Sequence, residues 1–223
     1  MNRQSYWIVF ASVLILCATV GAVQSQTPDL MRLGVGATVI SPPNGTPMAG
    51  YYSPRGSEGV LDDLYAKATV IDDGESRIAL VVCDLIGVPR TLVVESRRLI
   101  EEQSSIPGDC IMISATHTHT GPSLGGGSLY TSLEGEAGNS RREYEASLPV
   151  LIAEAVAQAV DDLQPARLAF ASEQEDKLAF VRRFWMRDGS VGWNPGRGNP
   201  NIIRPVGPID PEVALLYAER LEG

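Results

Sequence analysis

Two histidines, His117 and His119, are the only ones in the chain, and a single threonine separates them. They follow an apolar, β-branched run that begins at Cys110 and predicts a strand. Side chains two residues apart on a strand project from the same face, with Cα atoms about 7 Å apart. Neutral imidazole is the commonest zinc ligand, and catalytic zinc usually takes three protein ligands and keeps one open position. The pair predicts part of a metal site, although two such histidines can also make ordinary hydrogen bonds at a loop edge.

A βαβ unit is predicted to position this pair. Residues 77–85 form an apolar strand, residues 91–104 carry apolar side chains on one helical face, and residues 110–116 form the next strand. The two strands of such a unit are parallel, so Asp84 and His117 both fall at carboxyl ends, where open α/β sheets place ligands. Asp84 could orient a ligating histidine through its second nitrogen. A carboxylate that caps the turn after its strand is an equal alternative.

The rest of the chain predicts an α/β fold, with a mixed β-sheet whose βαβ unit is flanked by helices. Strands are expected at 33–39 and 64–71, and the turn Asp72-Asp73-Gly74-Glu75 joins the latter to the strand at 77–85. Residues 44–63 and 121–139 read as functional loops, the second with a Gly125–Gly127 run that could cover the site. Downstream we expect a helix at 144–163 opened or kinked by Pro149, strands at 168–173 and 178–184, a hairpin turn at 188–189, a loop at 194–211, and a last element from residue 212.

Residues 1–25 resemble an export signal: Arg3 precedes an apolar stretch, and Val23-Gln24-Ser25 offers small residues for cleavage. An uncleaved N-terminal anchor is the alternative. The expected location is secreted or periplasmic, or anchored in a membrane if the segment is not cleaved. The chain carries a net charge of −9, which argues against a nucleic-acid partner. Its composition is that of one globular domain.

Two cysteines, Cys83 and Cys110, remain after the predicted cleavage. Cys83 ends one apolar run and Cys110 begins another, in two successive predicted strands. If those strands are parallel neighbours, the sulfurs lie near opposite ends and are too far apart for a bridge. We therefore expect two buried free thiols.

Five segments together resemble the N-terminal part of the neutral/alkaline non-lysosomal ceramidase family. The most specific is Ser114-Ala-Thr-His-Thr-His-Thr-Gly-Pro122, and the similarity spans about residues 33–220. The other four precede it in order: Gly36-Ala-Thr-Val-Ile-Ser-Pro-Pro43, Pro47-Met-Ala-Gly-Tyr51, Leu64-Tyr-Ala-Lys-Ala68 and Cys83-Asp-Leu85.

The resemblance implies hydrolysis of the amide of ceramide, or of a related lipid-like N-acyl amide, at a Zn²⁺ ion. By it, His117 matches the first zinc ligand and His119 a histidine that contacts the substrate near the metal. Gly50 matches a loop glycine that approaches the substrate. Arg182 or Arg183 matches a substrate-contacting arginine. One of two neighbouring strand residues must point inward, so one of them could face a substrate, and surface charge on an edge strand is the alternative. Peripheral membrane contact would suit such a substrate.

The family pattern has further parts that this sequence lacks. A second zinc histidine, a glutamate, a tyrosine and a serine nucleophile would all follow residue 223, so residues 26–223 resemble one half of a larger catalytic domain. We expect the isolated chain to bind zinc weakly and to hydrolyse nothing by itself. Two other readings are a metal-dependent hydrolase with a (β/α)₈ barrel, and an exported module that binds lipid or metal without catalysis.

Overall fold

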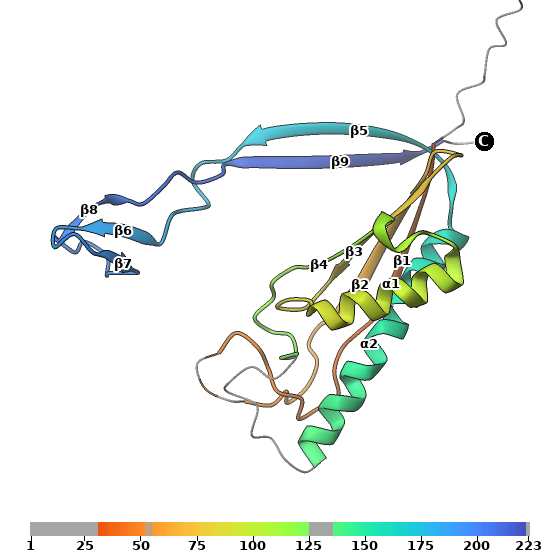
Figure 1. Ribbon diagram of the computed structural model, residues 1–223, viewed down its shortest axis with the longest axis horizontal. Helices are drawn as coiled ribbons and strands as arrows, with labels where there is room; N and C mark the ends of the chain where they lie inside the picture. The colour runs from red at the N-terminus through yellow and green to blue at the C-terminus, as the bar shows by residue number, and fades with distance from the viewer. Residues whose placement is uncertain (1–30, 52, 54, 125–135, 222–223) are drawn as a thin grey trace, which may run out of the picture.

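Figure 1 shows the computed structural model of the protein, which describes residues 31–51, 53, 55–124 and 136–221. The elements found there are β1 (Arg32–Val39), β2 (Tyr65–Asp72), β3 (Arg77–Cys83), α1 (Arg90–Ser104), a 3₁₀ turn (Gly108–Cys110), β4 (Ile111–Ala115), α2 (Glu136–Asp161), β5 (Gln164–Gln174), β6 (Arg183–Met186), β7 (Val191–Trp193), β8 (Ile202–Pro205) and β9 (Glu212–Arg220).

Six strands form one mixed sheet in the order β4-β3-β2-β1-β5-β9. Neighbouring strands are antiparallel except β3 and β4, which run parallel and are joined through α1. The predicted hairpin of β2 and β3 and the predicted βαβ unit are therefore confirmed. Because β3 and β4 are parallel neighbours, their carboxyl ends lie side by side, and the loops that follow them meet at one end of the sheet.

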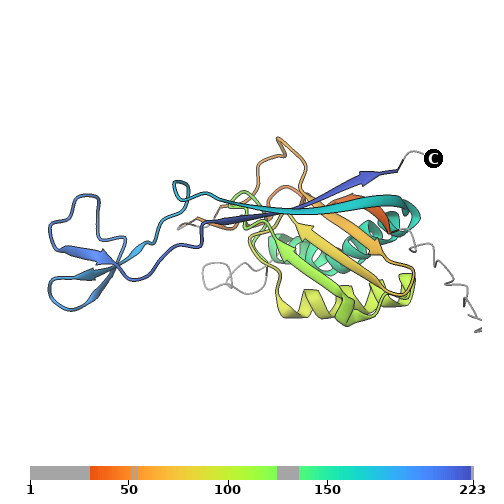
Figure 2. The ribbon, with the colours of Figure 1, turned by 90° about the horizontal axis from the view of Figure 1, so that it is seen from above.

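Both helices pack on one face of β1 to β4, as the two views in Figures 1 and 2 show. The strands alternate as expected, and the buried side includes Ala68, Val81 and Ile113. Two glycines bring α2 unusually close to β1. A Cβ on Gly34 would collide with the carbonyl oxygen of Ala159, and one on Gly36 would collide with that of Ala155. Helix α2 therefore lies directly against the backbone of β1.

The other face of the sheet is open in the part of the chain that the structure describes. Its exposed side chains are mostly apolar, namely Val35, Val39, Ile78, Val82 and Met112, with the charged Lys67 among them. Strand β5 pairs with β1 over only two residue pairs and then leaves with β9 as a two-stranded ribbon. Figures 1 and 2 show this ribbon extending from the body and carrying the small sheet β7-β6-β8 at its far end. Every residue of β9 is exposed.

The elements after the histidines differ from the predictions in four places. Strand β5 begins at Gln164 rather than at residue 168. Residues 178–182 are not a strand, and only β6, from Arg183, is paired; Leu178 and Phe180 are exposed apolar residues rather than a buried pattern. The predicted loop at 194–211 contains β8, which pairs with β6. No local pattern in the sequence predicts this pairing. Helix α2 begins at Glu136, earlier than predicted, because the apolar repeat used to locate it starts only at Tyr144.

Pro149 lies inside α2, where the sequence predicted an opening or a kink. The export signal predicted at 1–25 and the Gly125–Gly127 run lie outside the described residues. Within the described part, neither helix has the length and apolar character needed to cross a membrane.

Cys83 and Cys110 are both free, as predicted. Cys83 is buried in the core between the sheet and the helices, whereas Cys110 is only half-buried in the turn before β4. Burial, together with the nearby charge of Asp84, raises the pKa of the Cys83 thiol to about 12. Cys83 therefore stays protonated at neutral pH and acts as a small apolar core residue.

Asp72 is a buried carboxylate in the turn between β2 and β3. Its Oδ2 accepts a hydrogen bond from Arg77 Nε at 2.7 Å, and its Oδ1 accepts one from the Gly74 amide at 2.9 Å. Burial alone would raise the pKa of Asp72, but the hydrogen bonds from Arg77 and Gly74 and the nearby positive charges outweigh it and lower the pKa. The charged form is therefore stabilised in the folded protein.

Replacing Asp72 with asparagine is expected to lower the free energy of unfolding at pH 7 by about 1.5–3 kcal/mol, the range for hydrogen bonds to charged groups. Because the pKa is lower in the folded state, this stabilisation is complete above the unfolded value of about 3.9 and is lost as pH falls through the folded pKa. Urea unfolding from pH 7 down to pH 2 measures the difference. Glu75→Gln, an exposed change in the same turn, is the control; a pH-independent difference for Asp72→Asn would contradict the assignment.

Candidate functional site

The histidine pair lies on the loop that follows β4, at the carboxyl end of the strand, as predicted. The expected geometry is corrected: β4 ends at Ala115, and His117 has a left-handed backbone with a φ of 62°. The two imidazoles are nevertheless close, with ring centroids 5.2 Å apart and planes at 73° in an edge-to-face contact. Both side chains are exposed. A strained loop, rather than strand alternation, brings the two rings together.

His117 is held by a backbone group from the loop after β3. Its Nδ1 lies 2.7 Å from the carbonyl oxygen of Ile86. A carbonyl oxygen can only accept, so Nδ1 carries the hydrogen and donates it. In the neutral ring the lone pair is then on Nε2, which is the nitrogen left for a metal or a proton. A backbone carbonyl that fixes the tautomer in this way is a common partner of metal-binding histidines.

The second ring, that of His119, is flanked by a segment far away in sequence, residues 47–50, which we call the strap. The Ala49 amide donates to the Gly121 carbonyl at 2.9 Å, and the Ser123 amide donates to the Pro47 carbonyl at 2.8 Å. These bonds and the antiparallel bridge of Met48 with Pro122 fix the strap to the loop that carries the histidines.

Gly50 ends the strap and lies against His119. Its φ of +86° is a conformation that favours glycine. A Cβ built there would lie 2.5 Å from Cγ and 2.6 Å from Cβ of His119. The structure thus places Gly50 at the histidine pair, and its predicted contact with a substrate stays a prediction.

Asp84 makes a different contact from the one expected for orienting a histidine. Its Oδ2 accepts a hydrogen bond from the Tyr65 amide at 3.0 Å, and the Asp84 amide donates to the Tyr65 carbonyl at 2.8 Å. The carboxylate thus ties the end of β3 to the start of β2, a contact that neither alternative named, and the orientation of a histidine by Asp84 stays a prediction. In this structure the orienting contact to His117 comes from Ile86 instead, because the chain turns at 84–86 and presents a carbonyl to the ring.

The two histidines are of a residue type that binds zinc, but two side chains are fewer than a catalytic zinc site requires. Two exposed imidazoles, one with a defined free nitrogen, are typical zinc donors. Within the described ranges no three histidine, cysteine, aspartate or glutamate side chains gather around one point. A catalytic zinc usually takes three protein ligands, so these residues supply only part of a site.

The sequence comparison agrees with this arrangement. A family model described as neutral/alkaline non-lysosomal ceramidase, N-terminal, matches residues 31–183. The chain belongs to this ceramidase family. The matched region contains the strap, the βαβ unit and the histidine pair, together with β1 and α2.

Solved structures of ceramidases share the fold. A neutral ceramidase from Pseudomonas aeruginosa superposes with a TM-score of 0.59 at 22% sequence identity, over 84% of this chain and 29% of that one. A ceramidase complexed with C2 gives a TM-score of 0.57 at 22% identity, over 86% of this chain and 29% of that one. The chain thus spans less than a third of the length of either ceramidase.

The two candidate arginines of this ceramidase-family chain lie away from the histidine pair. Arg183 begins β6, and the Arg182 guanidinium carbon lies 5.8 Å from the centroid of the Trp193 ring. Figures 1 and 2 place β6 at the far end of the ribbon, remote from the loop after β4. Both side chains are exposed, so the structure does not decide between them, and their contact with a substrate stays a prediction.

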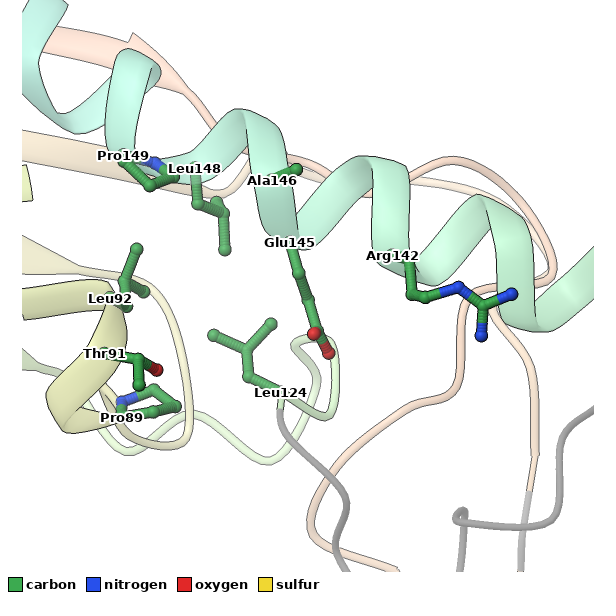
Figure 3. Close-up of a pocket in the computed structure, with 9 residues that line it drawn as sticks. All are labelled: Pro89, Thr91, Leu92, Leu124, Arg142, Glu145, Ala146, Leu148 and Pro149. Atoms are coloured by element: carbon green, nitrogen blue, oxygen red, sulfur yellow. The ribbon is translucent and has the colours of Figure 1, made fainter. Parts of the chain in front are cut away.

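A cavity of about 360 Å³ lies between the start of α1 and the middle of α2. Figure 3 shows Leu92, Leu124 and Leu148 turned toward one another inside it, with the guanidinium of Arg142 further out. The lining residues are Pro89, Thr91, Leu92, Leu124, Arg142, Glu145, Ala146, Leu148 and Pro149. The histidines do not line this cavity, so it is separate from the pair.

Two parts of the site have no clear signal in the sequence. The group that fixes His117 is the backbone carbonyl of Ile86, and a carbonyl is present at every residue. The strap bonds through the backbone to Gly121 and Ser123, more than seventy positions away. The sequence signal for the strap is the resemblance of Pro47-Met-Ala-Gly-Tyr51 to the family. That resemblance singled out Gly50 but did not indicate its contact with His119.

Proposed function

We propose that this chain provides the first part of a zinc-dependent amide hydrolase that acts on ceramide or a related N-acyl amphiphile. The observation that carries the proposal is the fixed tautomer of His117, whose free Nε2 suits a metal ligand in a chain of the ceramidase family. Because no three histidine, cysteine, aspartate or glutamate side chains gather among the described residues, the proposal takes the remaining ligands from elsewhere in the protein.

The chain's own residues have distinct roles in this proposal. His117 presents Nε2 to the metal, and the Ile86 carbonyl keeps its ring from turning. His119, in edge contact with His117, donates a hydrogen bond to the developing oxyanion or to the leaving amine. When bound, zinc polarises the amide carbonyl and lowers the pKa of a coordinated water, which suits an unactivated amide.

The substrate and location are further parts of the proposal. Family membership and the proposed chemistry favour a lipid-like amide, and an exported protein with peripheral membrane contact would meet such a substrate at a lipid surface. The apolar start of the sequence, from Trp7 to Val20, supports export.

The test compares the product of the complete open reading frame around this sequence with purified residues 26–223. Each protein is assayed on ceramide and on simple N-acyl amino acids, with added zinc and with a chelator. We expect the product of the complete frame to hydrolyse ceramide in a chelator-sensitive way and the shorter chain to be inactive. Activity only on N-acyl amino acids would contradict the proposal that ceramide is the substrate. Hydrolysis that resists the chelator would contradict the proposed dependence on zinc.

A non-catalytic binding module remains the second candidate, because a large apolar sheet face is open in the described residues. It predicts stoichiometric binding of lipid without turnover by the product of the complete frame. The same assay separates the two, since release of fatty acid occurs only in the first case.

A further inference from the structure

The strap and His119 meet at a point where the chain has no room for a side chain. Of the glycines with positive φ in the described residues, Gly50 is the one whose added Cβ would fall within 3 Å of a histidine. The atoms that it would meet include the Cβ of His119, which a rotation about χ1 does not move. His119 therefore cannot make room by changing its rotamer, and the backbones themselves would have to separate.

Hydrogen bonds hold the strap and the histidine loop in place next to this contact. Ala49, next to Gly50, donates to Gly121, and Ser123 donates to Pro47. Met48 and Ala49 are buried, at 8% and 4% exposed, so the strap is packed as well as hydrogen-bonded. His119 in turn lies edge to face with His117, whose Nδ1 is bound to Ile86. A shift of the strap would therefore move His119 relative to His117.

We propose that Gly50 is a positioning residue: its missing side chain lets the strap press on His119 and sets the distance between the two imidazoles. This inference rests on the proposed function only for its effect on catalysis, because the effect on ring geometry can be measured in the chain itself. It differs from the family resemblance, which implies that Gly50 approaches the substrate.

A Cβ added at Gly50 would lie 2.6 Å from the Cβ of His119, whereas two carbon atoms in ordinary contact are about 3.5 Å apart. Replacing Gly50 with alanine should therefore move the strap and His119 apart by about 1 Å. Misplacement of a catalytic group by that amount can reduce the rate about 100-fold. We expect the loss to appear in kcat rather than in KM, because the methyl group displaces a reacting side chain.

Gly45 provides a matched control in the same loop. Its φ of +84° is nearly that of Gly50, so alanine meets the same backbone strain at either position. A Cβ on Gly45 has no atom within 4 Å, whereas a Cβ on Gly50 meets His119. The difference between Gly45→Ala and Gly50→Ala isolates the contact with the ring from the effect of the left-handed backbone.

The experiment records the ring-proton contacts and imidazole nitrogen shifts of ¹⁵N-labelled chain by NMR. In Gly50→Ala we expect a weaker contact between the His117 and His119 rings and shifted His119 signals, while Gly45→Ala keeps both. Unchanged His119 signals in Gly50→Ala, or equal changes in the two variants, would overturn the proposal. If Gly50→Ala does not fold, the double variant Gly50→Ala/His119→Gly should regain the fold, because it removes the atoms that the methyl group meets; failure to recover would also overturn it.

The second measurement uses the hydrolytically active product of the complete reading frame. A kcat about 100-fold lower in Gly50→Ala, with KM changed much less, supports positioning. A raised KM with unchanged kcat would instead assign Gly50 to substrate contact and overturn the proposal. Absence of hydrolysis in the unmodified protein would refute the proposed function while the NMR result stands by itself.

Discussion

Alanine at Gly34 is expected to lower the free energy of unfolding by about 3 kcal/mol, the upper end of the cost of overpacking. The new Cβ would collide with the carbonyl oxygen of Ala159 and approach the Leu163 amide at 2.9 Å. Both are backbone atoms of the segment formed by α2 and the turn after it, so no side-chain rotation relieves the collision. The helix must lift from β1, which disturbs the packing of Leu148, Ile152 and Val156 in the core.

Urea unfolding followed by far-UV circular dichroism measures this effect. For a domain of about 200 residues, 3 kcal/mol corresponds to a melting temperature lower by roughly 6–12 °C. Gly59→Ala is the control, because its Cβ would have no atom within 4 Å and its φ lies outside the left-handed range. If Gly34→Ala were as stable as Gly59→Ala, helix α2 could not lie on β1 as described.

Alanine at His117 is expected to weaken zinc binding by at least about 100-fold, because loss of outer partners of a metal ligand already costs 10- to 100-fold. In the proposed zinc site the ligand nitrogen is Nε2, since Nδ1 donates to Ile86. Titration of ¹⁵N-labelled chain with zinc should therefore shift the His117 Nε2 signal first and leave Nδ1 protonated. In His117→Ala the only imidazole left is that of His119. Its nitrogen signals should show no saturable change at the same zinc concentrations.

His119→Ala is the matched control for this prediction, because it removes the neighbouring ring and keeps His117 with its bond to Ile86. We expect it to change zinc affinity less than tenfold, since His119 is assigned to the substrate rather than to the metal. In the hydrolytically active product of the complete frame, both substitutions should lower kcat. Equal loss of zinc binding in the two variants would make both histidines ligands and contradict the division of roles.

Local patterns in the sequence determined the first half of the fold. The turn Asp72-Asp73-Gly74-Glu75 between two apolar runs predicted the hairpin of β2 and β3, and the helical face at 91–104 before the run from Cys110 predicted the βαβ unit. These predictions depend on hydrogen bonds and periodicity within a few residues, which the sequence displays directly. The same patterns placed the histidine pair at a carboxyl strand end, whereas the ceramidase family was indicated by the resemblance of five segments and not by these patterns.

Longer-range contacts determined the second half, and there the sequence misled. The run at 178–184 has the composition of a strand but lacks a partner over most of its length, while β8 at 202–205 pairs with β6 without a local signal. Apolar residues such as Phe170 and Leu178 remain exposed on the ribbon and beyond it. Strand formation depends on what lies alongside, so composition alone does not settle it.

By itself, then, the sequence singled out His117 and His119 as the candidate chemical residues and predicted the end of the sheet at which they lie. Only the tertiary structure decided what surrounds them: the Ile86 carbonyl fixes the tautomer of His117, and Gly50 lies against His119. It also assigned Asp84 to the junction of β2 and β3. The physical reason is that these contacts involve backbone groups, or the absence of a side chain, brought together from separate loops, and neither leaves a pattern that can be read along the chain.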